Sequence, residues 1–129
     1  MVFHIPVMVN EVLHYLAPKD GATYLDCTLG SGGHLKAIAE NVQNAQLIGL
    51  DWDVEALEFA QNHLEAFRPK VRLVEGNFVN LKHIITTLGF DKVDGILFDL
   101  GASLYQLTTP ARGFGYEIDG PLDMRMNLN

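Results

Sequence analysis

Apolar residues along the chain fall into short runs that predict β-strands. Four runs, at residues 23–29, 46–51, 71–75 and 93–99, are short and largely apolar. Runs of this length without polar alternation are typical of strands that are buried on both faces of a parallel sheet. The pattern therefore predicts four buried strands.

Between these runs, apolar residues recur three and four positions apart, which is the spacing of one face of a helix. Asp53 and Asn80 stand where N-caps belong, and Gly89 stands where a helix end favours a left-handed residue. The first helix is expected over residues 7–16. The four stripes consist of Val9, Val12, Leu13 and Leu16; Leu35, Ile38, Ala39 and Val42; Leu57, Ala60, Leu64 and Phe67; and Leu81, Ile84, Ile85 and Leu88.

Strands that alternate with helices indicate an α/β fold with a parallel sheet covered on both faces. Right-handed crossovers favour the strand order 3-2-1-4, which is the core of a Rossmann-like sheet. We expect the sheet to be incomplete at its fourth-strand edge, because no further strand is predicted beside residues 93–99. This strand contains no proline or lysine that would discourage pairing with another strand. We expect a homodimer across this edge, or else a tail over residues 104–129 that folds back to cover it.

Composition narrows the class of protein. The 129 residues are 48% hydrophobic and 19% charged, which suits one globular domain over residues 1–129. A single cysteine excludes an internal disulfide, and the five histidines lack metal-ligand spacing, so no metal site is expected. With no apolar stretch near the ~20 residues of a membrane span and no visible signal peptide, we expect a cytoplasmic protein.

A glycine cluster follows the first predicted strand and opens the next helix. Gly30, Gly32 and Gly33 let the backbone approach a ligand, and the helix start offers free N–H groups to an anionic group. Asp51 ends the second strand, where a carboxylate can accept hydrogen bonds from ribose hydroxyls. Together these features predict a cofactor that contains a nucleoside.

The choice of cofactor depends on two further positions. The dinucleotide fingerprint needs a glycine at position 35, where this chain has Leu35. Asp26, just before the glycines, would repel a pyrophosphate and attract an ammonium group. S-adenosylmethionine carries an ammonium group, a carboxylate and a ribose, and it therefore fits Asp26, the glycines and Asp51 in turn.

Two later segments add candidates at the same end of the sheet. After the third strand, Asn77 can bond an adenine edge and Phe78 can contact its face, although Phe78 in the core is an equal alternative. The fourth strand ends at Asp99, which is either a functional carboxylate or an anchor of its loop.

The motifs HIPVMVNEVL, DCTLGSGGH, LIGLDWD, GILFDLG and RGFGYEIDGPLDMRM resemble those of the bacterial small-subunit ribosomal RNA cytosine-N4 methyltransferases. The resemblance spans essentially the whole chain and implies a class I methyltransferase fold. It implies transfer of methyl from S-adenosylmethionine to the exocyclic amine of a cytosine in small-subunit ribosomal RNA. The cofactor contacts that it implies are Gly32, Gly33, His34, Asp51, Phe78, Asp99 and Gln106.

For the substrate side, Asp99 and the carbonyls of the turn to Ser103 are candidates to accept the amine protons. Phe114 and Tyr116 can stack on a base or pack against the core in their loop, and these two roles are equal alternatives. Arg112 and Arg125 can meet phosphate, but pairing with Asp119 or Asp123 is the ordinary expectation.

The chain departs from the family pattern after the fourth strand. Leu104 and Tyr105 stand where the family has a Ser-Pro pair, Thr108 and Thr109 replace two aspartates, and Gly115 replaces a serine. Family members also continue for well over a hundred residues, so the chain looks like their N-terminal, cofactor-binding part. The net charge of −7 fits this, because RNA binding relies on Lys and Arg. A non-catalytic half-domain and a small-molecule methyltransferase stay as alternatives.

Overall fold

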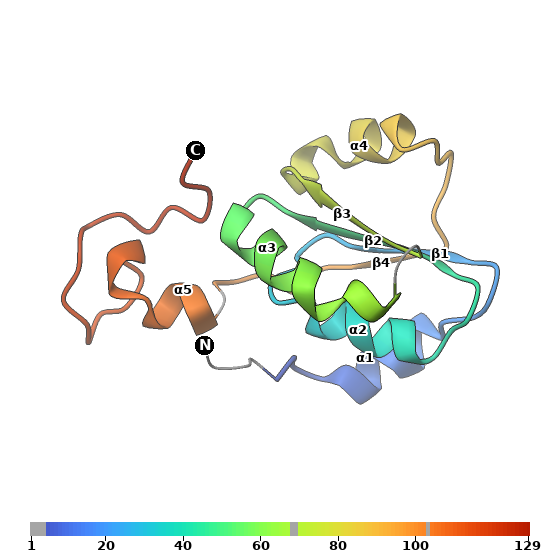
Figure 1. Cartoon of the computed structure of the whole chain (residues 1–129), viewed down its shortest axis with the longest axis horizontal. Coiled ribbons are helices and arrows are strands. Elements are labelled where there is room, and N and C mark those ends of the chain that lie inside the picture. Colours follow the sequence, from blue (N-terminus) through green and yellow to red (C-terminus); the bar gives the residue numbers. More distant parts are fainter. Residues whose placement is uncertain (1–4, 68–69, 103) are drawn as a thin grey trace.

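The computed structural model describes residues 5–67, 70–102 and 104–129. At its centre is a four-stranded sheet in which every neighbouring pair is parallel. The strand order is β3-β2-β1-β4, which confirms the predicted topology (Figure 1). The strands are β1 (Thr23–Asp26), β2 (Gln46–Asp51), β3 (Val71–Glu75) and β4 (Gly95–Leu97).

Helices cover both faces of this sheet, as the alternation of patterns predicts. In Figure 1, α4 lies on one face, and α1, α2 and α3 lie on the other. The short α5 and the segment after it extend beyond the sheet. The helices are α1 (Val9–Leu16), α2 (Gly33–Glu40), α3 (Val54–His63), α4 (Leu81–Thr87) and α5 (Leu104–Thr108), with 3-10 turns η1 (Glu65–Phe67), η2 (Phe78–Asn80) and η3 (Pro110–Arg112).

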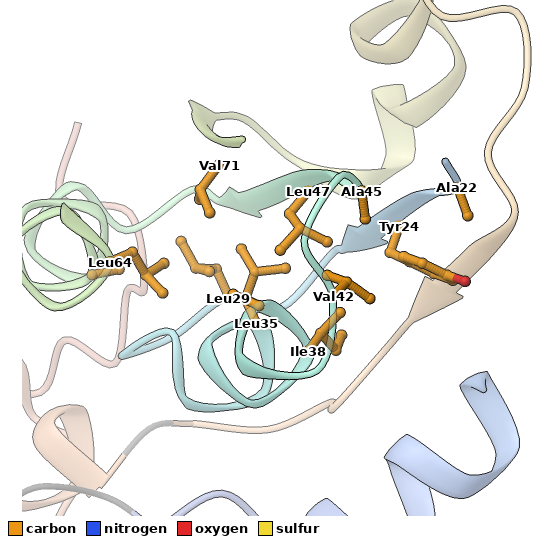
Figure 2. Close-up of a cluster of buried hydrophobic side chains, with 12 residues drawn as sticks. Ala22, Tyr24, Leu29, Leu35, Ile38, Val42, Ala45, Leu47, Leu64 and Val71 are labelled. Atoms are coloured by element: carbon orange, nitrogen blue, oxygen red, sulfur yellow. The ribbon is translucent and has the colours of Figure 1, made fainter. Parts of the chain in front are cut away.

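Two apolar clusters hold the layers together, one on each face of the sheet. Successive side chains of a strand point to opposite faces, so Leu47 packs toward α2 and α3, and Ile48 packs toward α4. Figure 2 shows the larger cluster, in which Leu35 and Ile38 from α2 and Leu64 beside α3 meet Leu47. The apolar stripes of α2, α3 and α4 therefore face the sheet as expected, whereas from α1 only Leu13 and Leu16 pack against the larger cluster.

The first and fourth strands end earlier than predicted. The N–H of Cys27 still donates to the carbonyl of Leu97, but the N–H of Leu29 already donates to Leu50 across the sheet. The N–H of Asp99 donates to the Thr28 hydroxyl instead of to a strand carbonyl. Polar side chains thus replace strand pairing at this end, and the backbone turns away from the sheet.

Two of the three predicted helix-end residues are confirmed. The Asp53 carboxylate accepts the N–H of Glu55 at the start of α3, and Gly89 has a φ of +89° after α4. Asn80 precedes α4 but makes no capping hydrogen bond with its side chain. Asn77 caps instead, because the chain first forms η2, and the Asn77 oxygen accepts the N–H of Val79.

Apolar side chains are exposed in β4 and directly after it, with Ile96 43% and Phe98 47% exposed. The tail, residues 104–129, makes hydrogen bonds to Asp53 and Glu55 near the start of α3, a helix that follows β2 and not β4. These contacts give no support to a tail folded over the β4 edge. Self-association across that edge stays a prediction.

Among the helices in the described part of the chain, none has the length and apolar character needed to span a membrane.

Removal of a core side chain tests the packing between the sheet and its helices. Leu47 is 0% exposed, so Leu47→Ala is expected to lower the free energy of unfolding by about 2–5 kcal/mol, because it leaves a cavity. Leu122→Ala is the matched control at a fully exposed leucine and is expected to change it by less than about 0.5 kcal/mol. Equal losses in urea unfolding would contradict this core.

Candidate functional site

A cavity of about 930 Å³ opens at the carboxyl ends of the strands. Parallel pairing brings all four strand ends to one edge of the sheet, and residues after each of them line this strand-end cavity. Most of the predicted cofactor contacts lie in its lining, whereas Asp26 and Gly32 do not. The predicted residues in the lining are Gly30, Gly33, His34, Asp51, Asn77, Phe78, Asp99 and Gln106.

The glycine turn brings the start of α2 to the cavity. Gly30 and Gly32 have φ values of +55° and +84°, which residues other than glycine rarely adopt. Helix α2 then begins at Gly33 without a side-chain cap, so its first N–H groups can bind an anionic group. A Cβ on Gly32 would lie 3.1 Å from Leu64 Cδ1, so this glycine also lets α2 approach α3.

Asp51 is half-buried in the lining and is held by two backbone donors. Its Oδ2 accepts the N–H of Gly30 at 2.8 Å, and its Oδ1 accepts the N–H of Asp53 at 2.9 Å. Burial raises the pKa of the Asp51 carboxyl, while these N–H groups act in the opposite direction. Each carboxylate oxygen has a second acceptor position, which suits a pair of hydroxyl groups.

The structure places Asp26 differently from the prediction. It is 1% exposed and lies outside the cavity lining, so its carboxylate offers no surface for direct contact with an ammonium group. Its Oδ1 accepts the N–H of Thr28 at 3.0 Å, and its Oδ2 has no partner within the described chain. Burial raises the pKa of Asp26 from 3.8 to about 6, and the charge of Asp51 adds to the rise. A cation in the cavity would therefore interact with Asp26 only through its field.

His34 and Asp99 come together from α2 and from the segment after β4. The Nε2–H of His34 donates to the Val7 carbonyl at 2.7 Å, because a carbonyl can only accept. His34 Nδ1 lies 3.9 Å from Asp99 Oδ2, which is beyond hydrogen-bond distance. The Asp99 side chain is 39% exposed and lines the cavity, so it is accessible to a substrate group. Ser103, the far end of the predicted turn, lies outside the described residues.

Asn77 and Phe78 lie on the β3 side of the cavity. Phe78 is 40% exposed, so it is not a core residue, and its ring meets Phe98 edge-on at 5.5 Å between centroids. The side-chain oxygen of Asn77 accepts the N–H of Val79, and its side-chain NH2 group can donate a hydrogen bond to a ligand. Both positions suit a flat heterocycle.

The predicted substrate arginines have other roles in the structure. Arg112 is 2% exposed and pairs with Asp53 and Glu55, instead of with Asp119 or Asp123, so its guanidinium does not reach a phosphate. Arg125 pairs with Asp123 at 2.6 Å, as the charge pattern predicts.

Phe114 and Tyr116 are absent from the cavity lining, and Tyr116 is 96% exposed. Stacking of a base against them stays a prediction.

Several lining residues are not among the predicted site residues, although Val7, Trp52 and Met126 lie within the motifs that resemble the family. Val7 lies at the cavity because its carbonyl accepts the Nε2–H of His34. Trp52 lies there because it directly follows Asp51 at the end of β2. Tyr105 and Met126 come from the tail, and Tyr105 is one of the departures from the family pattern. Only a prediction of how the tail folds would have found them.

The raised pKa of Asp26 leads us to expect that the stability of the fold depends on pH. The folded chain holds the Asp26 proton more tightly than the unfolded chain, so this carboxyl lowers stability as pH rises from about 4 to about 6. Asp26→Asn is expected to remove this penalty. Its free energy of unfolding relative to the unaltered chain should therefore rise between pH 4 and pH 7, by up to about 3 kcal/mol. A difference that is constant with pH in urea titrations would contradict the burial of a charged Asp26.

The sequence has close relatives among known proteins. It is 48% identical over 126 residues to ribosomal RNA small subunit methyltransferase H of Thermotoga neapolitana, covering 98% of this chain and 42% of that protein. It is 49% identical over 127 residues to the protein of the same name from Kosmotoga olearia, covering 98% and 43%. The chain thus spans less than half the length of these relatives.

Solved structures share the fold at low sequence identity. A SAM-dependent O-methyltransferase from Thermotoga maritima aligns with a TM-score of 0.61 at 19% identity, covering 78% of this chain and 37% of that one. An rRNA methylase from Streptococcus thermophilus aligns with a TM-score of 0.59 at 19% identity, covering 78% and 57%. The Rossmann-like methyltransferase fold predicted from the sequence is thereby confirmed.

The family comparison also bears on the cofactor. A model of the MraW methylase family matches residues 1–129. Methylases of this fold use S-adenosylmethionine, which supports the cofactor predicted from the glycine turn and Asp51. The chain belongs to the MraW methylase family.

Proposed function

We propose that residues 1–129 form the S-adenosylmethionine-binding domain of a methyltransferase that modifies small-subunit ribosomal RNA. The observation that carries this proposal is Asp51, which two backbone N–H groups hold in the cavity beside the start of α2. The names of the relatives supply the RNA class. A ribosomal substrate would place the protein in the cytoplasm.

The carboxylate, the ribose and the adenine of the cofactor each have a matching group in the strand-end cavity. The N–H groups at the start of α2 would bind the carboxylate. Asp51 would accept the ribose hydroxyls, and Asn77 and Phe78 would contact the adenine. Gln106 completes the lining on the tail side. A pyrophosphate would bring more negative charge than a single carboxylate into the field of Asp26 and Asp51, which disfavours a dinucleotide.

The proposed acceptor is the exocyclic amine of a cytosine, as the motif resemblance implies. When bound, the cofactor would supply an electrophilic methyl group on a sulfonium, which the amine nitrogen would take up as the bond to sulfur breaks. The amine is a weak nucleophile, so the protein must orient it and accept one of its protons. The base must also leave its stack to reach a cavity of this kind.

Asp99 is the candidate to orient that amine. Its carboxylate is partly exposed in the cavity, and its backbone N–H is fixed by the Thr28 hydroxyl at 2.6 Å. A hydrogen bond from the amine to Asp99 would direct the nitrogen lone pair and give the departing proton an acceptor. Asp99 can alternatively bind the cofactor, as the family resemblance implies.

Cofactor binding is tested by titration calorimetry with S-adenosylhomocysteine. The chain is expected to bind it, and Asp51→Ala is expected to weaken binding by about tenfold or more, because hydrogen bonds to a charged group are lost. Asp91→Ala, at an exposed loop residue, is the matched control and should bind like the unaltered chain. Heat with NAD but none with S-adenosylhomocysteine would contradict the proposed cofactor.

The substrate is tested by transfer of labelled methyl to small-subunit ribosomal RNA. The isolated chain is expected to transfer little, because it carries 16 acidic against 9 basic residues and spans less than half of its relatives. Robust transfer by these 129 residues would contradict that expectation. Whatever label is transferred should, after nucleoside digestion, lie in N4-methylcytidine. Label in another nucleoside would exclude the cytosine amine, and label only in small molecules would favour the small-molecule alternative.

A further inference from the structure

The motif RGFGYEIDGPLDMRM forms most of a tail that is folded around one buried arginine. The carbonyl of Arg112 accepts the N–H of Met124 at 2.9 Å, which brings the two ends of the motif together. Gly113 has a φ of +74°, and a Cβ there would collide with the Pro121 carbonyl. Close backbone packing and this dihedral explain why glycine stands at position 113.

The Arg112 side chain binds both its own tail and the start of α3. One terminal nitrogen donates to Asp53 Oδ2 at 2.8 Å and to the Met126 carbonyl at 2.7 Å, and the other donates to Glu55. Arg112 and Asp53 are each only 2% exposed. A single guanidinium thus joins segments that are 59 residues apart in sequence.

Asp53 passes this contact on to the cavity. Its Oδ2 accepts the Gln106 amide at 2.6 Å, and its backbone N–H donates to Asp51 Oδ1 at 2.9 Å. Gln106, Asp51 and Met126 line the cavity, whereas Arg112 and Asp53 do not. Arg112 therefore contacts the lining directly at Glu55 and Met126, and through Asp53 it is connected to Asp51 and Gln106, although it does not line the cavity itself.

We propose that Arg112 is a positioning residue for the cofactor: its ion pair with Asp53 fixes the Asp51 acceptor and holds Gln106 and Met126 in the cavity lining. This inference rests on the cofactor site proposed above. Because coupling between sites is reciprocal, a cofactor that needs the tail in place must also stabilise the folded tail.

The chemistry of the pair explains why arginine stands at position 112. Its planar group serves two carboxylates and two carbonyls at once, and the single ammonium of a lysine has no such fork. Removal of Arg112 would leave the buried Asp53 charge without compensation. Asp53 would then move toward water, and Asp51 and Gln106 would lose their fixed partner.

Titration calorimetry with S-adenosylhomocysteine distinguishes this positioning role from a general effect of removing an arginine from the tail. Arg112→Met is expected to bind at least tenfold more weakly than the unaltered chain, and Arg112→Lys between the two. Arg125→Met is the matched control, because Arg125 lies in the same tail but is exposed and pairs only with Asp123 among the described carboxylates. It should bind within about twofold of the unaltered chain. Equal affinities for Arg112→Met and Arg125→Met would overturn the proposal.

Hydrogen exchange of the unaltered chain gives a second readout that does not depend on how a variant folds. The amides of Gly113 and Met124 bond to carbonyls of the tail and lie outside the cavity lining. Saturating S-adenosylhomocysteine is expected to slow their exchange at least threefold. Unchanged exchange with ligand bound would overturn the coupling and leave the cofactor site intact. Absence of any binding by the unaltered chain would contradict both.

Discussion

Parallel pairing of the four strands is the constraint on which the candidate site depends. Asp26 pairs in register with Gly49 on one side and Leu97 on the other, and Asp51 pairs with Glu75. The residues just beyond these positions therefore meet at one edge, although they are distant in sequence. Strand pairing ends there, so side chains such as Thr28 and Asp51 satisfy the backbone N–H groups. The same side chains form the cavity.

Three aspartates near this edge acquire different roles from their surroundings. Asp26 is buried with one oxygen unpartnered, which makes its charge unfavourable and raises its pKa. Asp51 is half-buried and keeps acceptor positions toward the cavity. Asp53 is buried but compensated by Arg112, so it acts as a structural anchor while capping α3. Burial and the available donors, not residue type, distinguish a ligand-binding carboxylate from a structural one.

Periodicity predicted the fold well, because the strands and helices of this chain are each specified by local patterns. The strand order, the helix faces, the Asp53 cap and the place of Asp51 all follow from those patterns and from the handedness of crossovers. The sequence predicted the wrong surroundings for Asp26 and Arg112. A contact such as Arg112 to Asp53 depends on how a glycine-rich tail folds, and no periodic pattern encodes that. The second and third strands have the predicted bounds, but the first and fourth end earlier than predicted, since side-chain bonds decide where pairing stops there.

The central claim is that the strand-end cavity is a cofactor site whose tail-side lining is held by Arg112. A crystal structure of the chain with S-adenosylhomocysteine tests it most directly. We expect ribose hydroxyls on Asp51, the ligand carboxylate at the start of α2, and Arg112 still paired with Asp53. A ligand bound outside the cavity, or bound within it while Arg112 is separated from Asp53, would contradict the account.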